Sequence, residues 1–340
     1  MSASERSPVI AVDANGADDP RAVADGAAAA VARGIPVLFF GPADLAPPGA
    51  EAVDAPISIA KEPDPARAVR STPEASIVQA ARAVAEGRAQ ALVSGGSTGA
   101  ALAAGLFNVK RAKGIHRPAL AIPLPVPGAP VTLLDVGAND LCRPEHLVQF
   151  AFMGAALANA VLGVAKPRVG LLSNGTEPGK GRDEVVAAHE RLAGMSGLDF
   201  IGNVEGFALT EGVADVIVTD GFTGNVALKT AEGVSQAMIG FVRRAATSSP
   251  RAKAGGALLR PALRGLKDEL DPEASGGAYL LGLRRLAVVP HGSFGPRGFE
   301  EAIVRAERGV REDVIGRTYA ALQDAGALRR VPASDGVTSV

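Results

Sequence analysis

Tryptophan is absent from this sequence of 340 residues, and aromatic residues make up only 4% of it. Proteins that stack nucleic-acid bases or enclose quaternary ammonium ions depend on aromatic side chains, so the composition argues against both classes. An excess of positive charge is absent too, because 35 Lys and Arg against 36 Asp and Glu give a formal net charge of −1. A nucleic-acid-binding protein carries a basic footprint, and we therefore expect no nucleic-acid partner.

Cysteine and histidine are scarce. The single cysteine, Cys142, excludes an internal disulfide and fits a reducing, cytoplasmic environment. The spacing nearest to a metal motif, Cys142 to His146, lacks a second pair of ligands, so we expect no metal. None of the glycine-rich loops is a nucleotide-binding P-loop or a complete dinucleotide fingerprint, so we expect no cofactor.

Long hydrophobic runs are missing as well. No apolar stretch reaches the ~18–20 residues that a membrane span needs. The longest candidate, 151–165, is predicted to be a buried helix. Residues 1–8 are polar and lead straight into a strand-like run, so we expect no secretory signal.

What the sequence does contain is an alternation of short Val-, Ile- and Leu-rich runs with longer Ala-rich stretches. Continuous apolar strands separated by helices predict an α/β fold, with a doubly wound, mainly parallel sheet flanked by helices. The predicted strands are 9–13, 35–41, 91–95, 119–125, 131–137, 168–174, 200–203, 215–220 and 286–292. The predicted helices are 20–34, 74–87, 101–112, 144–163, 183–194 and 224–245.

The domain organisation is predicted to be simple. One α/β domain, 9–325, lies between flexible tails at 1–8 and 326–340. The stretch 246–277 breaks the rhythm with glycines, prolines and basic residues, and it predicts a protruding helical excursion.

Four predicted strands end in one pattern, in which glycines and small polar residues lead into a helix. Glycines let a ligand approach the backbone, and a helix N-terminus attracts anions, so the four loops together favour a phosphate-bearing ligand. Any one of them alone is explained by ordinary turns and caps. The candidate binding residues are Gly96, Ser97, Thr98 and Gly99; Asp135, Gly137 and Asn139; Asn174, Gly175 and Lys180; Asp220, Gly221, Thr223, Gly224 and Asn225; and, in a weaker fifth case, Asp13 and Gly16.

Three charged or titratable residues stand out near these loops. Lys180 is the one lysine inside a glycine-rich loop, where a compact cation can neutralise phosphate. His291 ends an apolar strand and is followed by Gly292 and Ser293, so a role in the site and a packing role are equally open. Arg117 precedes a strand and is either a phosphate clamp or a structural ion-pair partner.

Several segments resemble a known family. RPALAIPLP at 117–125, LLDVGANDLCRPEHLVQFAFMG at 133–154, DVIVTDGFTGNVALKT at 215–230, GGAYLLG at 276–282 and PHGS at 290–293 follow one another as in the PlsX-type phosphate acyltransferases. The resemblance implies a fold related to phosphotransacetylases and usually a homodimer. The implied reaction converts long-chain acyl carrier protein and inorganic phosphate to acyl phosphate and free carrier protein, in phospholipid biosynthesis, with acyl-CoA as an alternative donor.

The sequence also departs from this family at several positions. Ala17 replaces a glycine, Thr72 a lysine, Ser97 an asparagine and Thr176 an acid. Two further readings therefore stay open, namely a short-chain phosphotransacylase that uses CoA and a paralogue that binds a phosphorylated metabolite without turnover.

Acyl transfer to phosphate needs no covalent enzyme intermediate, because phosphate is itself a nucleophile and a thiolate leaves readily. We expect Lys180 and Asn225 to hold phosphate or the oxyanion, with His291 as an acid or an orienting group. Asp220 would repel phosphate, so we expect it to orient loop donors or Lys180.

Residues 251–267 place leucines beside five basic side chains. Such a segment suits an anionic membrane surface, and packing in a dimer is an equal alternative.

Overall fold

The computed structural model describes residues 7–124, 126, 130–269 and 271–329. Strands in this part of the chain form one eleven-stranded sheet in the order β3–β2–β1–β4–β11–β10–β5–β6–β9–β7–β8. The strands are β1 (Ile10–Asp13), β2 (Val37–Gly41), β3 (Glu51–Asp54), β4 (Ala91–Ser94), β5 (Ala119–Leu124), β6 (Val131–Leu134), β7 (Arg168–Leu172), β8 (Asp199–Val204), β9 (Val216–Val218), β10 (Ala278–Leu281) and β11 (Leu286–Val289).

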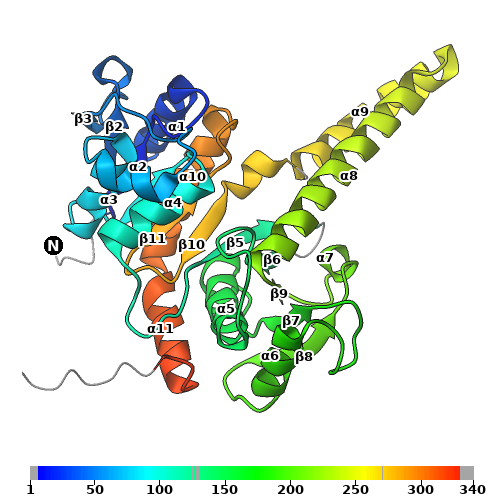
Figure 1. Cartoon of the computed structure of the whole chain (residues 1–340). Coiled ribbons are helices and arrows are strands. Elements are labelled where there is room, and N and C mark those ends of the chain that lie inside the picture. Colours follow the sequence, from blue (N-terminus) through cyan, green and yellow to red (C-terminus); the bar gives the residue numbers. More distant parts are fainter. Residues whose placement is uncertain (1–6, 125, 127–129, 270, 330–340) are drawn as a thin grey trace, which may run out of the picture.

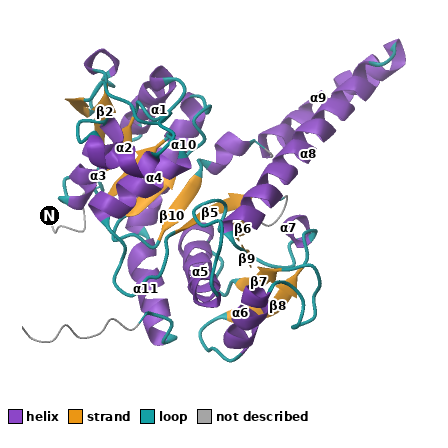
Figure 2. Ribbon diagram, in the orientation of Figure 1, coloured by secondary structure: helices purple, strands orange, loops and turns teal. Residues whose placement is uncertain are grey.

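Helices cover both faces of this sheet, as Figure 2 shows. They are α1 (Pro20–Ala32), α2 (Pro65–Ser71), α3 (Ser76–Ala85), α4 (Thr98–Ala104), α5 (Pro144–Leu157), α6 (Asp183–Ala193), α7 (Ala208–Glu211), α8 (Gly221–Thr247), α9 (Pro250–Glu269), α10 (Pro296–Arg311) and α11 (Val314–Asp324). One hydrophobic cluster joins the sheet to α1, α5, α6, α10 and α11, and a second joins it to α2, α3, α4, α7 and α8. The α/β fold with helices on both faces is therefore confirmed.

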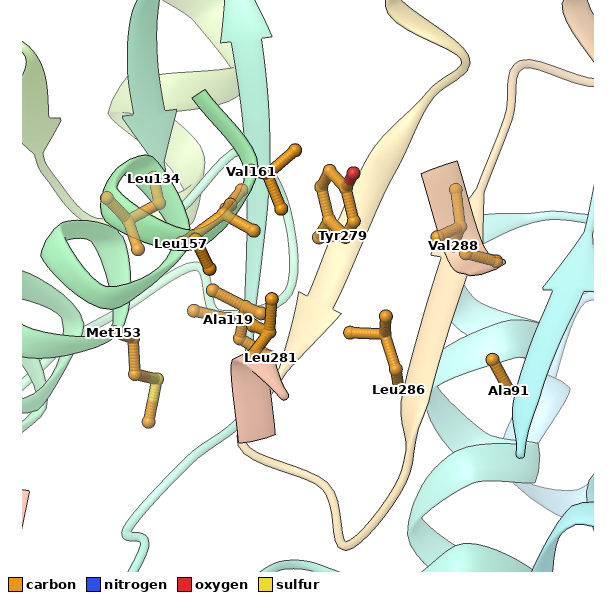
Figure 3. Packing of buried hydrophobic residues seen from close by; sticks show 14 of the residues in the cluster. Ala91, Ala119, Leu134, Met153, Leu157, Val161, Tyr279, Leu281, Leu286 and Val288 are labelled. Carbon is orange, nitrogen blue, oxygen red and sulfur yellow. The ribbon is translucent and has the colours of Figure 1, made fainter. Parts of the chain in front are cut away.

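The first cluster includes side chains from the middle of the sheet. Tyr279 and Leu281 of β10 pack there with Leu157 and Val161, which follow one another along α5 and its continuation (Figure 3). Alternate residues of β10, Ala278 and Leu280, belong to the second cluster. Because β10 is apolar on both faces, it connects the two cores at the centre of the molecule.

The strand directions reverse at the centre of the sheet. β10 runs antiparallel to both β11 and β5, and β5 runs antiparallel to β6, whereas the pairs on either side are parallel. The register places Leu134, the last residue of β6, in the same row as Val288 and Val93. β4 and β11 thus approach this row from one direction, and β6 approaches it from the opposite one. The loops after β4 and β11 and the turn after β6 all begin near this row, in the central region of the sheet.

A long arm projects from the body beside this region. α8 runs from the body into the arm, and α9 packs back along it (Figure 1). The helical excursion predicted around 246–277 is confirmed, and it consists of the end of α8 with α9.

Some sequence predictions are corrected. β3, β10, α2, α10 and α11 were not expected as elements. The strand predicted at 131–137 ends at Leu134, because Asp135 already turns its carboxylate back to accept backbone N–H groups. Residues 1–6 and 330–340 of the predicted tails lie outside the described residues, and the predicted domain limits stay a prediction.

The helix around the apolar run 151–165 is longer than the run itself. Helical structure extends from Pro144 to Leu162, which by length and composition would be enough to cross a membrane. However, 78% of its most apolar window is buried, so it serves as the core helix that the sequence predicted.

Candidate active site

A cavity of about 590 Å³, here called the polar cavity, opens at the central region described above. Loops after β1, β4 and β11 form one side, and the first half of α8 faces them. It is lined by residues 15–18, 58, 60–61, 95–98, 120, 122, 136, 225, 228–229, 232, 236, 272, 275, 277–278 and 289–294.

Hydrogen bonds to the carboxylate of Asp13 hold the loops after β1 and β4 in place. This carboxylate is fully buried and accepts hydrogen bonds from Ser76 Oγ at 2.5 Å and Ser94 Oγ at 2.7 Å. Burial raises the pKa of Asp13, while the hydrogen bonds from both serines act to lower it. Asp13 does not line the polar cavity, and its hydrogen bonds join β1 to α3 and to the end of β4.

Gly16 and Gly96 belong to these loops and line the cavity. A β-carbon at Gly16 would lie 2.7 Å from the backbone nitrogen of Gly96, so only glycine lets the two loops approach this closely.

Ser97 and Thr98 bring a helix end to the same wall. Ser97 is the N-cap of α4, and its Oγ accepts the N–H of Ala100 at 3.2 Å. The first N–H groups of a helix have no partner within the helix, so the start of α4 offers donors together with the Thr98 hydroxyl. This arrangement suits an oxyanion of phosphate.

His291 lines the cavity from the loop after β11. Its Nδ1 lies 2.8 Å from Ser293 Oγ and accepts the N–H of Ser293 at 3.3 Å. A ring nitrogen that accepts carries no proton in neutral imidazole, so the proton of the neutral ring lies on Nε2. His291 therefore presents a hydrogen-bond donor.

The opposite wall of the polar cavity is formed by α8, whose N-cap residue is Asp220. Asp220 is buried, and its carboxylate accepts the N–H of Thr223 at 2.9 Å and the hydroxyl of Thr223 at 2.7 Å. It also pairs with Arg182. These contacts agree with the prediction that Asp220 orients loop donors, which stays a prediction, and the ion-pair partner of Asp220 is Arg182.

A second buried carboxylate, Asp135, holds the turn after β6. It accepts N–H groups from Leu120 at 2.9 Å and Ala138 at 3.0 Å, and the Asn139 side chain donates to it at 2.8 Å. Burial raises the pKa of Asp135. A β-carbon at Gly224 would collide with the Asp135 carbonyl oxygen, so this glycine serves the contact between α8 and the turn.

The cavity contains two cations that sequence reasoning missed. Lys61 follows β3 and forms no ion pair within the described ranges, whereas Lys229 pairs with Glu232 at 2.8 Å. Lys229 lies one helical turn after Asn225, so helical periodicity alone would have placed it on the same face. Lys61 lies in a loop without a glycine-rich pattern, and no sequence signal pointed to it.

The predicted site residues thus fall into two groups. Those that line the polar cavity are Gly16, Gly96, Ser97, Thr98, Asn225 and His291. Those that do not line it are Asp13, Gly99, Arg117, Asp135, Gly137, Asn139, Asn174, Gly175, Lys180, Asp220, Gly221, Thr223 and Gly224.

Two members of the second group lie in other surroundings. Lys180 is on the loop after β7, and its carbonyl oxygen accepts the side-chain N–H of Asn203 at 3.4 Å. Arg117 lines a separate basic pocket of about 470 Å³ with Arg111, Arg143 and Arg329.

The only cysteine is chemically quiet. Burial, with the nearby charges of Asp135 and Asp220, raises the pKa of the Cys142 thiol to about 12. A thiol must ionise to attack, so Cys142 is not a nucleophile near neutral pH.

Comparison with known proteins identifies relatives along nearly the whole chain. The model of the family described as fatty acid synthesis protein matches residues 9–317. A protein named phosphate acyltransferase from Moorella thermoacetica is 44% identical over 317 residues, which cover 90% of this chain and 93% of the relative. Another of that name from Geobacillus thermodenitrificans is 44% identical over 324 residues, covering 92% and 98%.

Solved structures share the fold at much lower identity. A phosphotransacetylase from Streptococcus pyogenes superposes with a TM-score of 0.63 at 15% identity, covering 90% of this chain and 95% of its own. A branched-chain phosphotransacylase from Enterococcus faecalis gives 0.55 at 15% identity, covering 89% and 99%. At this identity the likeness concerns the fold alone.

Proposed function

The chain belongs to the fatty acid synthesis protein family, whose relatives compared above are named phosphate acyltransferases, and we propose that it makes acyl phosphate from a long-chain acyl carrier protein and inorganic phosphate. The observation that carries this proposal is the polar cavity, which is lined together by Ser97 and Thr98 at the start of α4, by Asn225 of α8 and by His291. Donors from several elements converge there on a volume that takes phosphate and a thioester carbonyl.

The chemical step is a direct displacement. A phosphate oxygen attacks the thioester carbonyl carbon, a C–O bond forms, and the C–S bond then breaks to release the carrier thiolate. The protein contributes by holding both reactants in line and by stabilising the oxyanion. Cys142, with a thiol pKa of about 12, takes no part as an acyl carrier.

Each wall has its role in this step. The start of α4, with Ser97 and Thr98, holds phosphate. Asn225 donates its side-chain N–H to phosphate or to the oxyanion, and His291 donates Nε2–H to the same developing charge. Lys61 and Lys229 lower the electrostatic cost of bringing phosphate into the cavity.

Lys180 stays a prediction of the sequence. Its loop is joined to the α8 cap through Arg182 and Asp220, which supports an indirect role in positioning that cap.

The subunit arrangement is part of the proposal. Exposed apolar side chains form a stripe along α8, namely Val226, Val234, Met238, Phe241 and Val242. A helix with such a stripe suits burial against another subunit, which supports a homodimer.

The exposed leucines of α9 bear on where the protein acts. Leu258 is 85% exposed and Leu259 is 59% exposed, on a helix that carries Arg251, Lys253 and Arg260. We expect a cytoplasmic enzyme that contacts an anionic membrane through 251–267. Flotation with anionic liposomes should be lost in Leu258→Glu with Leu259→Glu while the dimer persists, and loss of the dimer instead would assign these leucines to subunit packing.

The decisive experiment measures free thiol and acyl phosphate after mixing the protein with palmitoyl carrier protein, with and without phosphate. Thiol release that requires phosphate supports the proposal. Faster turnover of acetyl-CoA than of palmitoyl carrier protein would favour the short-chain reading. Absence of release from every thioester would favour the binding-only reading.

A further inference from the structure

A second cavity of about 690 Å³, here called the apolar cavity, adjoins the polar one. Ile122, Leu228, Glu232, Gln236, Pro272 and Ser275 line both, so β5, α8 and the segment before β10 form a common wall. From this arrangement, and resting on the proposed function, we infer that the apolar cavity is the subsite for the long acyl chain.

The lining beyond the common wall is suited to hydrocarbon. Leu124 comes from β5, Leu209 from α7, and Ala231 and Ile239 from α8. Apolar side chains from three elements therefore face one volume, and each methylene buried there favours binding about fourfold.

Charged side chains in the lining of this cavity already have ion-pair or hydrogen-bond partners. Arg297 pairs with Asp271 at 3.2 Å. Glu273 accepts the N–H groups of Gly295 at 2.8 Å and Gly298 at 3.1 Å. These charges have partners, so they do not constitute a second anion site.

The helical periodicity of α8 places residues that line the polar cavity next to residues that line the apolar cavity. Asn225 and Lys229 face the polar cavity, Ala231 and Ile239 face the apolar one, and Leu228 between them lines both. A ligand that fits both volumes has an anionic head and a long apolar tail, as a long-chain acyl phosphate has. A short acyl group would leave the apolar cavity empty.

The test changes chain-length preference without touching the polar cavity. Ala231→Phe places a ring in the apolar cavity, and Ala231→Leu fills less of it. The control is Ala320→Phe on α11, which is exposed and lies in neither cavity and outside the α8 stripe. Rates are measured with butyryl, octanoyl and palmitoyl thioesters, and each variant's melting temperature is compared with wild type.

We expect Ala231→Phe to lower kcat/KM for palmitoyl thioester at least tenfold while butyryl thioester changes less than twofold. Ala231→Leu should give an intermediate loss, and Ala320→Phe should leave both values unchanged. In parallel, palmitate binding measured by calorimetry should weaken most in Ala231→Phe, less in Ala231→Leu and not at all in the control.

The outcomes separate this inference from the proposed function. Equal chain-length profiles in wild type and Ala231→Phe, with wild type making palmitoyl phosphate, would overturn the inference alone. A changed oligomeric state with an unchanged profile would instead assign the cavity to subunit contact. If wild type makes no acyl phosphate, the proposed function fails, and palmitate binding by wild type but not Ala231→Phe would still support an acyl subsite.

Discussion

The polar and apolar cavities share a wall but are built from different parts of the chain. The loops after β1, β4 and β11 form the polar cavity together with the first half of α8, and the buried carboxylates of Asp13 and Asp135 hold the backbone around it in place. Side chains on β5, α7 and α8 form the apolar cavity. The reactive end is therefore fixed by the fold, whereas the other end can be altered one side chain at a time.

The largest loss of stability and activity is expected when the backbone contact behind the polar cavity is disturbed. Gly224→Ala should lower both melting temperature and activity, because its β-carbon collides with the Asp135 carbonyl and overpacking costs roughly 1–3 kcal/mol or more. The matched control is Gly233→Ala on the same helix, where a β-carbon meets open space and stability should rise slightly. A Gly224→Ala protein as stable and active as wild type would contradict the argument.

The next effect is chemical rather than structural. Asn225 is exposed in the cavity, so Asn225→Ala should retain the wild-type melting temperature. Its kcat should fall about 100-fold, the usual loss when one donor to a developing oxyanion is removed. Steady-state kinetics with palmitoyl carrier protein measure this, with exposed Thr230→Ala as the control. A change in KM with unchanged kcat would show that Asn225 serves binding alone.

A smaller effect, on the KM for phosphate, is expected when each of three lysines is replaced by alanine. Lys61→Ala and Lys229→Ala should each raise KM for phosphate about tenfold, because a cation is removed from the cavity that holds the anion. Lys180→Ala should raise it less, since Lys180 lines neither cavity. The reverse order would restore Lys180 to the direct role that the sequence suggested.

The smallest effect concerns the pH dependence of stability. Burial raises the native pKa of Asp13 above its ordinary value of 3.8, so the native state holds a proton that the unfolded chain has released. Native stability from this group is present below pH 3.8 and is lost as pH rises through the native pKa. The unfolding free energy of Asp13→Asn minus that of wild type should therefore increase with pH over this window, as urea titrations can measure. A difference that falls with pH would show that the hydrogen bonds from Ser76 and Ser94 outweigh burial.

Much of this architecture could be predicted from local pattern. Apolar runs identified most strands, and the loop after 215–220 predicted a helix from 224, three residues after α8 begins at Gly221. The reversal at β10 could not be predicted, because a short apolar strand reads the same in either direction. Lys61 and the apolar cavity depend on contacts between distant segments, and the lining of the polar cavity was consequently only partly foreseen.

The length of α8 limits how this chain can change in evolution. α8 is a continuous helix of 27 residues, and at 1.5 Å per residue it is about 40 Å long. Deleting one residue after Asn225 would turn everything beyond it by about 100°, moving Ala231 and Ile239 off the apolar cavity and the exposed stripe off its face. A single substitution in α8 leaves the other side chains on their faces, whereas a deletion rotates all the residues that follow it. The length of α8 is therefore more constrained than its individual residues.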